Sequence, residues 1–154
     1  MSIRTAASFT LGLTVVATLL TSGSACADRK LTRAQVPAPV LAAFEKAYPK
    51  ATVRGYEMDQ EDGTTLYEIA SVEGGKTREV SYRPDGSVSE VEEAMAPGAL
   101  PAGVVQAVGA LIPKATIRRA ERVTRGDVIQ YEVGLLQGTK KSERVFDATG
   151  KAVK

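Results

Sequence analysis

The stretch YPKATVR at residues 48–54 returns as IPKATIR at residues 112–118, 64 residues further along the chain. The same shift aligns other positions: Val36-Pro37 with Leu100-Pro101, and Tyr67-Glu68-Ile69 with Tyr131-Glu132-Val133. Many matches at one offset, without gaps, indicate an internal repeat. The sequence therefore predicts two copies of one unit, at residues 28–96 and 97–154.

Each copy has the pattern of one helix followed by strands. Pro37 suits the first turn of a helix, and that helix must end before Pro49, because the residue before a proline avoids the helical region. Beyond this point the hydrophobic period changes to two, as at Tyr67 and Ile69, which indicates strands with one covered face. Turn residues separate three strands in each copy, and residues 87–92 of the first copy add a further strand.

The expected fold class is α+β, built from two tandem units that each pack one helix on one face of an antiparallel sheet. The other sheet face is expected to be open. A unit of about 60 residues buries too little surface to be robust alone. We therefore expect the two sheets to join or pack closely, which the short linker at residues 94–99 favours.

The N-terminus has the pattern of a secretory signal peptide at residues 1–27. Arg4 is followed by an apolar run at residues 6–20 that is too short for a comfortable membrane span, and the segment ends in Ala25-Cys26-Ala27. Cleavage near Ala27 predicts a periplasmic or secreted protein, and no later segment is apolar enough to span a membrane. A lipid anchor at Cys26 is the alternative, although Gly23 stands where a lipoprotein signal favours a leucine-like residue.

The repeated motifs resemble those of the PepSY-like domain family of exported bacterial proteins. They are Val/Leu-Pro, then Pro-x-Ala-x-Val/Ile, then Tyr-Glu-Ile/Val, then an aromatic residue and a glycine, and they cover most of residues 36–154. The resemblance implies a helix on one face of an antiparallel sheet, similar in architecture to the β-lactamase inhibitory protein with its concave binding face. It also implies binding or inhibition of an exported, peptidase-like partner. The chain departs from that inhibitory protein in having no cysteine beyond Cys26, and hence no disulfide.

Composition argues against an enzyme. The chain has no histidine to activate a serine, and neither Gly-x-Ser-x-Gly nor Ser-x-x-Lys occurs. Without histidine, and with one cysteine inside the signal, the usual ligands of zinc, copper and haem are lacking, so we expect no cofactor. The acidic residues that might form a catalytic pair are interpreted as solvated charges: Glu90, Glu92, Glu93 and the acids at 59–62.

A calcium site is the basis of an alternative function, an exported protein that binds a small ligand or a metal ion. The acids that suggest it are Glu57, Asp59, Glu61, Asp62 and Glu68. An EF-hand loop needs glycine at its sixth position, whereas Gly63 is seventh counting from Glu57. The segment also has a strand–turn–strand pattern, so an acidic hairpin is the simpler interpretation.

Charge is distributed unevenly along the chain. Residues 28–96 carry 9 Lys/Arg and 13 Asp/Glu, whereas residues 97–154 carry 10 and 5. The near-neutral total argues against nucleic acid as a partner. Two explanations stay open: the halves attract each other, or Arg118, Arg122 and Arg144 form a basic face that meets an acidic partner.

The Tyr-Glu-Ile/Val repeat suggests further partner-binding residues. If Tyr67 and Tyr131 face the helices, Glu68 and Glu132 project from the open face, and Arg54 and Tyr56 are candidates to join them. The alternative is that the tyrosines are core and the glutamates serve solubility. The candidate partner-binding set is Arg54, Tyr56, Glu68, Arg118, Arg122, Glu132 and Arg144.

Overall fold

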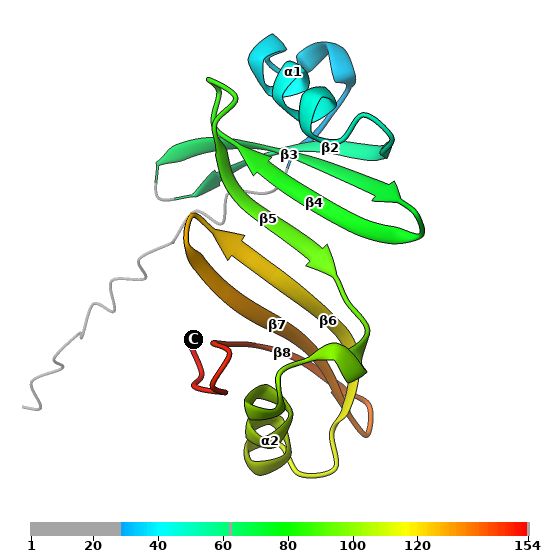
Figure 1. Cartoon of the computed structure of the whole chain (residues 1–154), viewed down its shortest axis with the longest axis vertical. Helices are drawn as coiled ribbons and strands as arrows, with labels where there is room; N and C mark the ends of the chain where they lie inside the picture. The colour runs from blue at the N-terminus through cyan, green and yellow to red at the C-terminus, as the bar shows by residue number, and fades with distance from the viewer. Residues whose placement is uncertain (1–28, 62, 154) are drawn as a thin grey trace, which may run out of the picture.

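The computed structural model describes residues 29–61 and 63–153, so the expected signal peptide and Cys26 lie outside the described residues. The described chain forms a sheet of eight antiparallel strands and two α-helices (Figure 1). The strands are β1 (Arg29–Leu31), β2 (Thr52–Glu61), β3 (Thr64–Glu73), β4 (Lys76–Tyr82), β5 (Val88–Ala94), β6 (Thr116–Arg125), β7 (Val128–Gln137) and β8 (Lys140–Phe146). The helices are α1 (Ala38–Ala47) and α2 (Ala102–Leu111), with 3-10 turns at Arg33–Gln35 and Pro97–Ala99.

The sheet is continuous from β1 to β8, in chain order, and this corrects the predicted fold class. β5 pairs with β6, with Val91 opposite Thr124 and Glu93 opposite Arg122. The prediction of two tandem helix-plus-sheet units is therefore wrong: the chain is one eight-stranded antiparallel sheet with two short helices. The physical reason is that an unpaired β5 and β6 would each leave a row of backbone N–H and C=O groups without partners.

Prolines delimit both helices. α1 begins directly after Pro37 and ends before Pro49, and α2 begins directly after Pro101 and ends before Pro113. A proline at a helix start loses no hydrogen bond, and the residue before a proline disfavours helical geometry. None of the helices among the described residues is long and apolar enough to cross a membrane.

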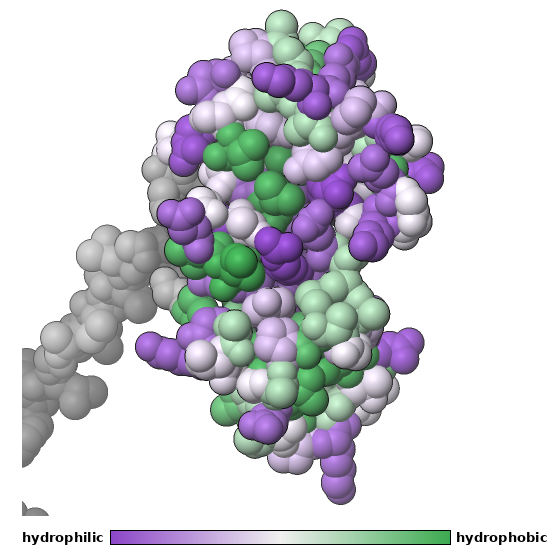
Figure 2. Space-filling view, viewed as in Figure 1, coloured by the Kyte–Doolittle hydropathy of each residue, from purple (hydrophilic) through white to green (hydrophobic). Residues whose placement is uncertain are grey.

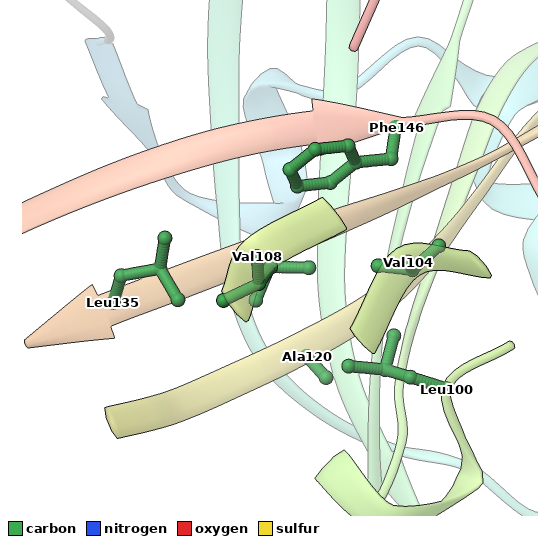
Figure 3. Close-up of a cluster of buried hydrophobic side chains, with 7 residues drawn as sticks. Leu100, Val104, Val108, Ala120, Leu135 and Phe146 are labelled. Atoms are coloured by element: carbon green, nitrogen blue, oxygen red, sulfur yellow. The ribbon is translucent and has the colours of Figure 1, made fainter. Parts of the chain in front are cut away.

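The helices cover two hydrophobic clusters. Val40 and Phe44 of α1 pack on Ile69, Val80 and Tyr82. The cluster under α2 contains Leu100, Val104, Val108, Ala120, Val133, Leu135 and Phe146, and Figure 3 shows the helix residues directed toward the strand residues. In Figure 1 the two helices lie at opposite ends of the molecule.

Both clusters lie on the same face of the sheet. Val91 packs against the α1 cluster and is the register partner of Thr124, which has the same orientation as Ala120 in the α2 cluster. Side chains alternate between faces along a strand. The opposite face, called the open face below, has no described helix on it, and its side chains include the buried Leu66 and Val123.

Candidate functional site: the open face of the sheet

Acidic side chains dominate the open face. Register partners place these acids on it: Glu57, Asp59, Glu68, Glu79, Glu90, Glu92, Glu121, Glu132 and Glu143. The basic residues with the same orientation are fewer: Lys30, Arg119, Arg125 and Lys141. Figure 2 shows one side of the molecule, on which hydrophilic residues spread over both halves and hydrophobic residues form separate patches.

One arginine pairs with the acids contributed by β6, β7 and β8. The Nη2 atom of Arg119 donates to Glu132 Oε1 at 2.6 Å and also pairs with Glu143, while its Nη1 atom lies 3.3 Å from Glu121 Oε2. Glu121 is only 9% exposed. We call Arg119, Glu121, Glu132 and Glu143 the arginine cluster: a single guanidinium, a planar group with five N–H donors, serves carboxylates from three strands.

Burial shifts the proton affinities of this cluster. It raises the pKa of Glu132 to about 7, and the hydrogen bond between Glu132 and Glu143 adds to the rise. The same hydrogen bond, together with Arg119, lowers the pKa of Glu143. Burial also raises the pKa of Glu121, whereas the positive charge of Arg119 lowers it. Glu132 and Glu143 thus compete for one proton beside the fixed positive charge of Arg119.

The first half of the sheet, β1 to β5, contains a cavity of about 260 Å³ on the open face. Its carboxylates define what we call the acid pocket: Glu57, Asp59, Glu68, Glu90 and Glu92. Leu66 supplies an apolar wall, and Ser81 and Ser89 complete the polar lining. Arg125 reaches the pocket from β6, where it pairs with Glu90 and donates to Gln130 Oε1 at 3.1 Å.

Negative charge in the acid pocket is partly suppressed by protonation. Burial raises the pKa of Glu92 to about 7, and its neighbours Glu90 and Glu79 raise it further, whereas Arg119 opposes the rise. Glu92 therefore holds a proton for part of the time at neutral pH. A cation that enters the pocket would displace this proton, because a positive charge favours the ionised carboxylate.

The predicted partner-binding residues are distributed over both faces of the sheet. Glu68 and Glu132 lie on the open face, whereas Tyr56 packs against the α1 cluster on the helix-covered face. Arg54 and Arg118 lie at β-bulges, where the register shifts between Val53 and Gly55 and between Ile117 and Arg119.

The other two predicted arginines, Arg122 and Arg144, lie outside the open face. Arg122 lies opposite Tyr131 on the helix-covered side, 3.8 Å from Glu93. Arg144 is the register partner of the buried Val133 and lines a shallow hollow with Leu111 at the end of α2. The structure thus does not assemble Arg118, Arg122 and Arg144 with the open-face glutamates into one binding surface.

Arg119 is the residue that sequence reasoning overlooked. The bulge between Ile117 and Arg119 inserts one residue into β6. Alternation counted from Ile117, which packs on the α2 cluster, therefore puts Arg118 and not Arg119 on the open face. The sequence does contain a signal for the cluster. Its glutamates, Glu121, Glu132 and Glu143, each lie 64 residues after another glutamate: Glu57, Glu68 and Glu79.

Metal binding gains no support from the geometry. Within residues 29–61 and 63–153, no three Asp, Glu, His or Cys side chains are grouped so that they could hold a metal ion. Asp62, one of the acids considered for calcium, lies outside the described residues.

No protein-family model and no curated protein sequence matches the chain. Solved structures do resemble it. A protein attributed to the periplasm of Bacteroides eggerthii is 19% identical, with 77% of this chain and 86% of that chain covered and a TM-score of 0.65. A DUF2874 family protein of Bacteroides ovatus is 20% identical, with 77% and 84% covered and a TM-score of 0.62.

A third structural neighbour is a BLIP-like protein of Bacteroides fragilis. It is 19% identical, with 77% of this chain and 84% of that chain covered and a TM-score of 0.58. Sequence identities this low support a shared fold but do not indicate a shared activity. The chain thus shares its fold with DUF2874 family proteins and has an architecture consistent with BLIP-like proteins.

Proposed function

We propose that this chain is an exported, non-catalytic protein that binds another exported protein through the open face of its sheet. The observation that carries the proposal is the asymmetry of the sheet. Both helices pack on one face, while the other face presents charged side chains from β2 to β8 around a cavity. A sheet face on which none of the described helices packs is available to a partner.

Export is supported by the signal-like N-terminus and by the fold shared with proteins attributed to the periplasm. A non-catalytic role is supported by the lack of histidine and of any activated nucleophile in the sequence. We further propose that binding inhibits or restrains a peptidase-like partner. The PepSY-like motifs and the BLIP-like neighbour support this proposal.

Site-specific photo-crosslinking tests this proposal. A photoreactive residue is placed at Ser81, on the open face, or at Gln106, exposed on α2. Each variant is purified from the periplasm and incubated with periplasmic extract. We expect one dominant adduct from position 81 and none from position 106, with the yield falling as salt rises. Adducts from position 106 alone, or from neither position, would overturn the proposal.

A further inference from the structure

The two halves of the sheet differ at the outer edge of their last hairpin. The 64-residue offset relates β8 to β4, and the registers agree, because Tyr131 lies opposite Phe146 just as Tyr67 lies opposite Tyr82. On its other side β4 pairs with β5 along most of its length. β8, in contrast, is the last strand in the sheet order.

The described chain begins the strand that would be equivalent to β5 and pairs only its first residues. Phe146 forms an isolated bridge with Ala152, which repeats the pairing at the start of β5, 64 residues earlier. The Val153 N–H donates to the Val145 carbonyl at 2.9 Å. Within residues 29–61 and 63–153, no strand continues this pairing along the outer edge of residues 140–144.

The backbone of β8 presents hydrogen-bonding groups along this edge. Because the Val145 carbonyl accepts from Val153, the backbone groups of Val145 point outward, and by alternation so do those of Glu143 and Lys141. The Glu143 carbonyl accepts a hydrogen bond at 2.7 Å from Nη1 of the neighbouring Arg144, in place of a strand N–H. A row of outward N–H and C=O groups is a template for another strand.

The charge of this edge indicates which kind of strand it would accept. Lys140, Lys141 and Arg144 are exposed, and none of them forms an ion pair with the described residues. The acid of this strand, Glu143, already pairs with Arg119. Carboxylates in an added strand would therefore be favoured, whereas a second copy of β8 would bring the same cations together.

A hollow of about 210 Å³ beside this edge offers room for side chains of the added strand. Its lining includes Lys140 and Arg144 of β8 and Leu111 at the end of α2. Leu111 is an exposed apolar side chain. Since side chains alternate between faces, every second residue of an added strand would lie on this side. The hollow therefore fits a segment that combines acidic and apolar residues.

We propose that β8 accepts an extended acidic segment of another protein, which adds antiparallel to it as β5 does to β4. In that internal example the Glu93 carboxylate lies 3.1 Å from the guanidinium of its register partner Arg78. Main-chain hydrogen bonds supply the affinity of such strand addition, and side-chain contacts supply its specificity. The surface is the edge of the sheet and not its open face, so the inference goes beyond the proposed function.

A peptide with the sequence of residues 87–95 is the probe, because it contains β5, the strand that this fold places on the equivalent edge. Its binding to the protein purified from the periplasm is followed by amide shifts in NMR spectra and by fluorescence anisotropy. We expect the shifts to concentrate at residues 140–145. Shifts confined to other strands would overturn the inference.

Two control peptides separate strand addition from attraction between charges. One is N-methylated at Glu90 and Glu92, whose backbone groups face β4 in the fold, and it retains every charge. The other has glutamine in place of each glutamate. We expect each to bind about tenfold more weakly than the probe. Equal binding of the N-methylated peptide would overturn strand addition, and equal binding of the glutamine peptide would overturn the selection of acidic segments.

A matched pair of variants tests the same edge from the side of the protein. Lys141→Pro removes an outward N–H, a change that edge strands tolerate, whereas Lys141→Ala removes the same charge and retains the N–H. We expect Lys141→Pro to weaken probe binding about tenfold and Lys141→Ala to weaken it less than about threefold. Equal weakening by both would overturn strand addition. Circular dichroism verifies folding, and the N-methylated peptide tests these hydrogen bonds without changing the protein.

Analytical ultracentrifugation over a range of protein concentrations tests the other occupant, a second copy of this chain. We expect a monomer, because two β8 strands would place like charges side by side. A dimer that Lys141→Pro dissociates would assign the edge to self-association and would overturn the proposed partner.

Discussion

Glu79 on β4 and Glu92 on β5 are register partners, so two carboxylates lie side by side on the open face. Burial is the main cause that raises the pKa of Glu92 to about 7, and Glu90 and Glu79 contribute to the rise. The pKa of Glu132, on β7, is also raised to about 7, and burial is again the main cause. These acids make the face sensitive to pH near neutrality.

The first prediction concerns stability against pH. Because the pKa values of Glu92 and Glu132 rise on folding from 4.5 to about 7, the folded chain binds more protons than the unfolded chain within that window. The free energy of unfolding therefore falls as pH increases from about 4.5 to 7. We expect a higher Tm at about pH 5 than at about pH 7.5, measured by circular dichroism.

A substitution isolates the contribution of Glu92 to this pH dependence. Glu92→Gln retains the shape and removes the charge, so the variant should lose part of the fall in Tm between about pH 5 and 7.5. Glu45→Gln is the control, because Glu45 lies exposed on α1 and pairs with Arg33. A Tm that rises with pH in the parent chain, or an equal effect of both substitutions, would contradict this assignment.

The second prediction contrasts two glycines of α2. A Cβ at Gly103 would collide with the backbone carbonyl of Thr149, in the turn after β8, whereas a Cβ at Gly109 meets nothing within 4 Å. Gly109→Ala should stabilise the protein by about 0.5–1 kcal/mol, the usual helix preference of alanine over glycine. Gly103→Ala should destabilise it. Urea unfolding of both variants measures the difference, and equal shifts would refute the close contact.

The third prediction concerns Arg78, which lies on the helix-covered face and is 15% exposed. Its guanidinium is 3.1 Å from Glu93 and 3.3 Å from Glu73, and its Cζ lies 4.2 Å from the centre of the Tyr48 ring. Arg78→Ala should cost about 2 kcal/mol, because it leaves partly buried carboxylates without their donor.

Arg122→Ala is the matched comparison for Arg78. Arg122 is 45% exposed and lies 3.8 Å from the same Glu93. An exposed pair of this kind contributes under about 1 kcal/mol. Chemical denaturation measures the free energy of unfolding of both variants. A larger decrease for Arg122→Ala than for Arg78→Ala would show that the Arg78 contacts do not stabilise the fold as argued.

The fourth prediction concerns the α2 cluster. Phe146 is fully buried there, next to Val104 and Val108. Phe146→Ala should destabilise the protein by about 3–5 kcal/mol through lost burial and the cavity that remains. Val153→Ala, at a side chain that is 39% exposed, should change stability by less than about 0.5 kcal/mol. Similar losses for both would contradict the assigned core.

Local features of the fold could be predicted from the sequence. Prolines mark both ends of α1 and α2, and the alternation around Tyr67 and Tyr131 marks β3 and β7. The sequence led us to expect that the two sheets join or pack closely, but it did not specify which strands would pair. The junction pairs Glu93 with Arg122 and Val91 with Thr124, and the hydrophobic pattern of neither strand specifies that partner.

The candidate site was predictable only in part. Alternation correctly places Glu68 and Glu132 opposite the tyrosines beside them. Counted from Ile117 it misplaces Arg118 and Arg119, because the bulge between Ile117 and Arg119 adds a residue to β6, whereas Arg122 follows the alternation and lies opposite Tyr131. The acid pocket gathers side chains from β2, β3 and β5, which no single stretch of sequence brings together.

The order of strands in the sheet, identical to their order in the chain, has a consequence for folding kinetics. Most pairings join strands connected by short turns, and only β1–β2 and β5–β6 must wait for a helix between them. Closing a short loop costs little chain entropy, so hairpins can form early and independently. The β1–β2 and β5–β6 pairings are then the late steps, and of these two it is β5–β6 that makes one sheet of the two halves.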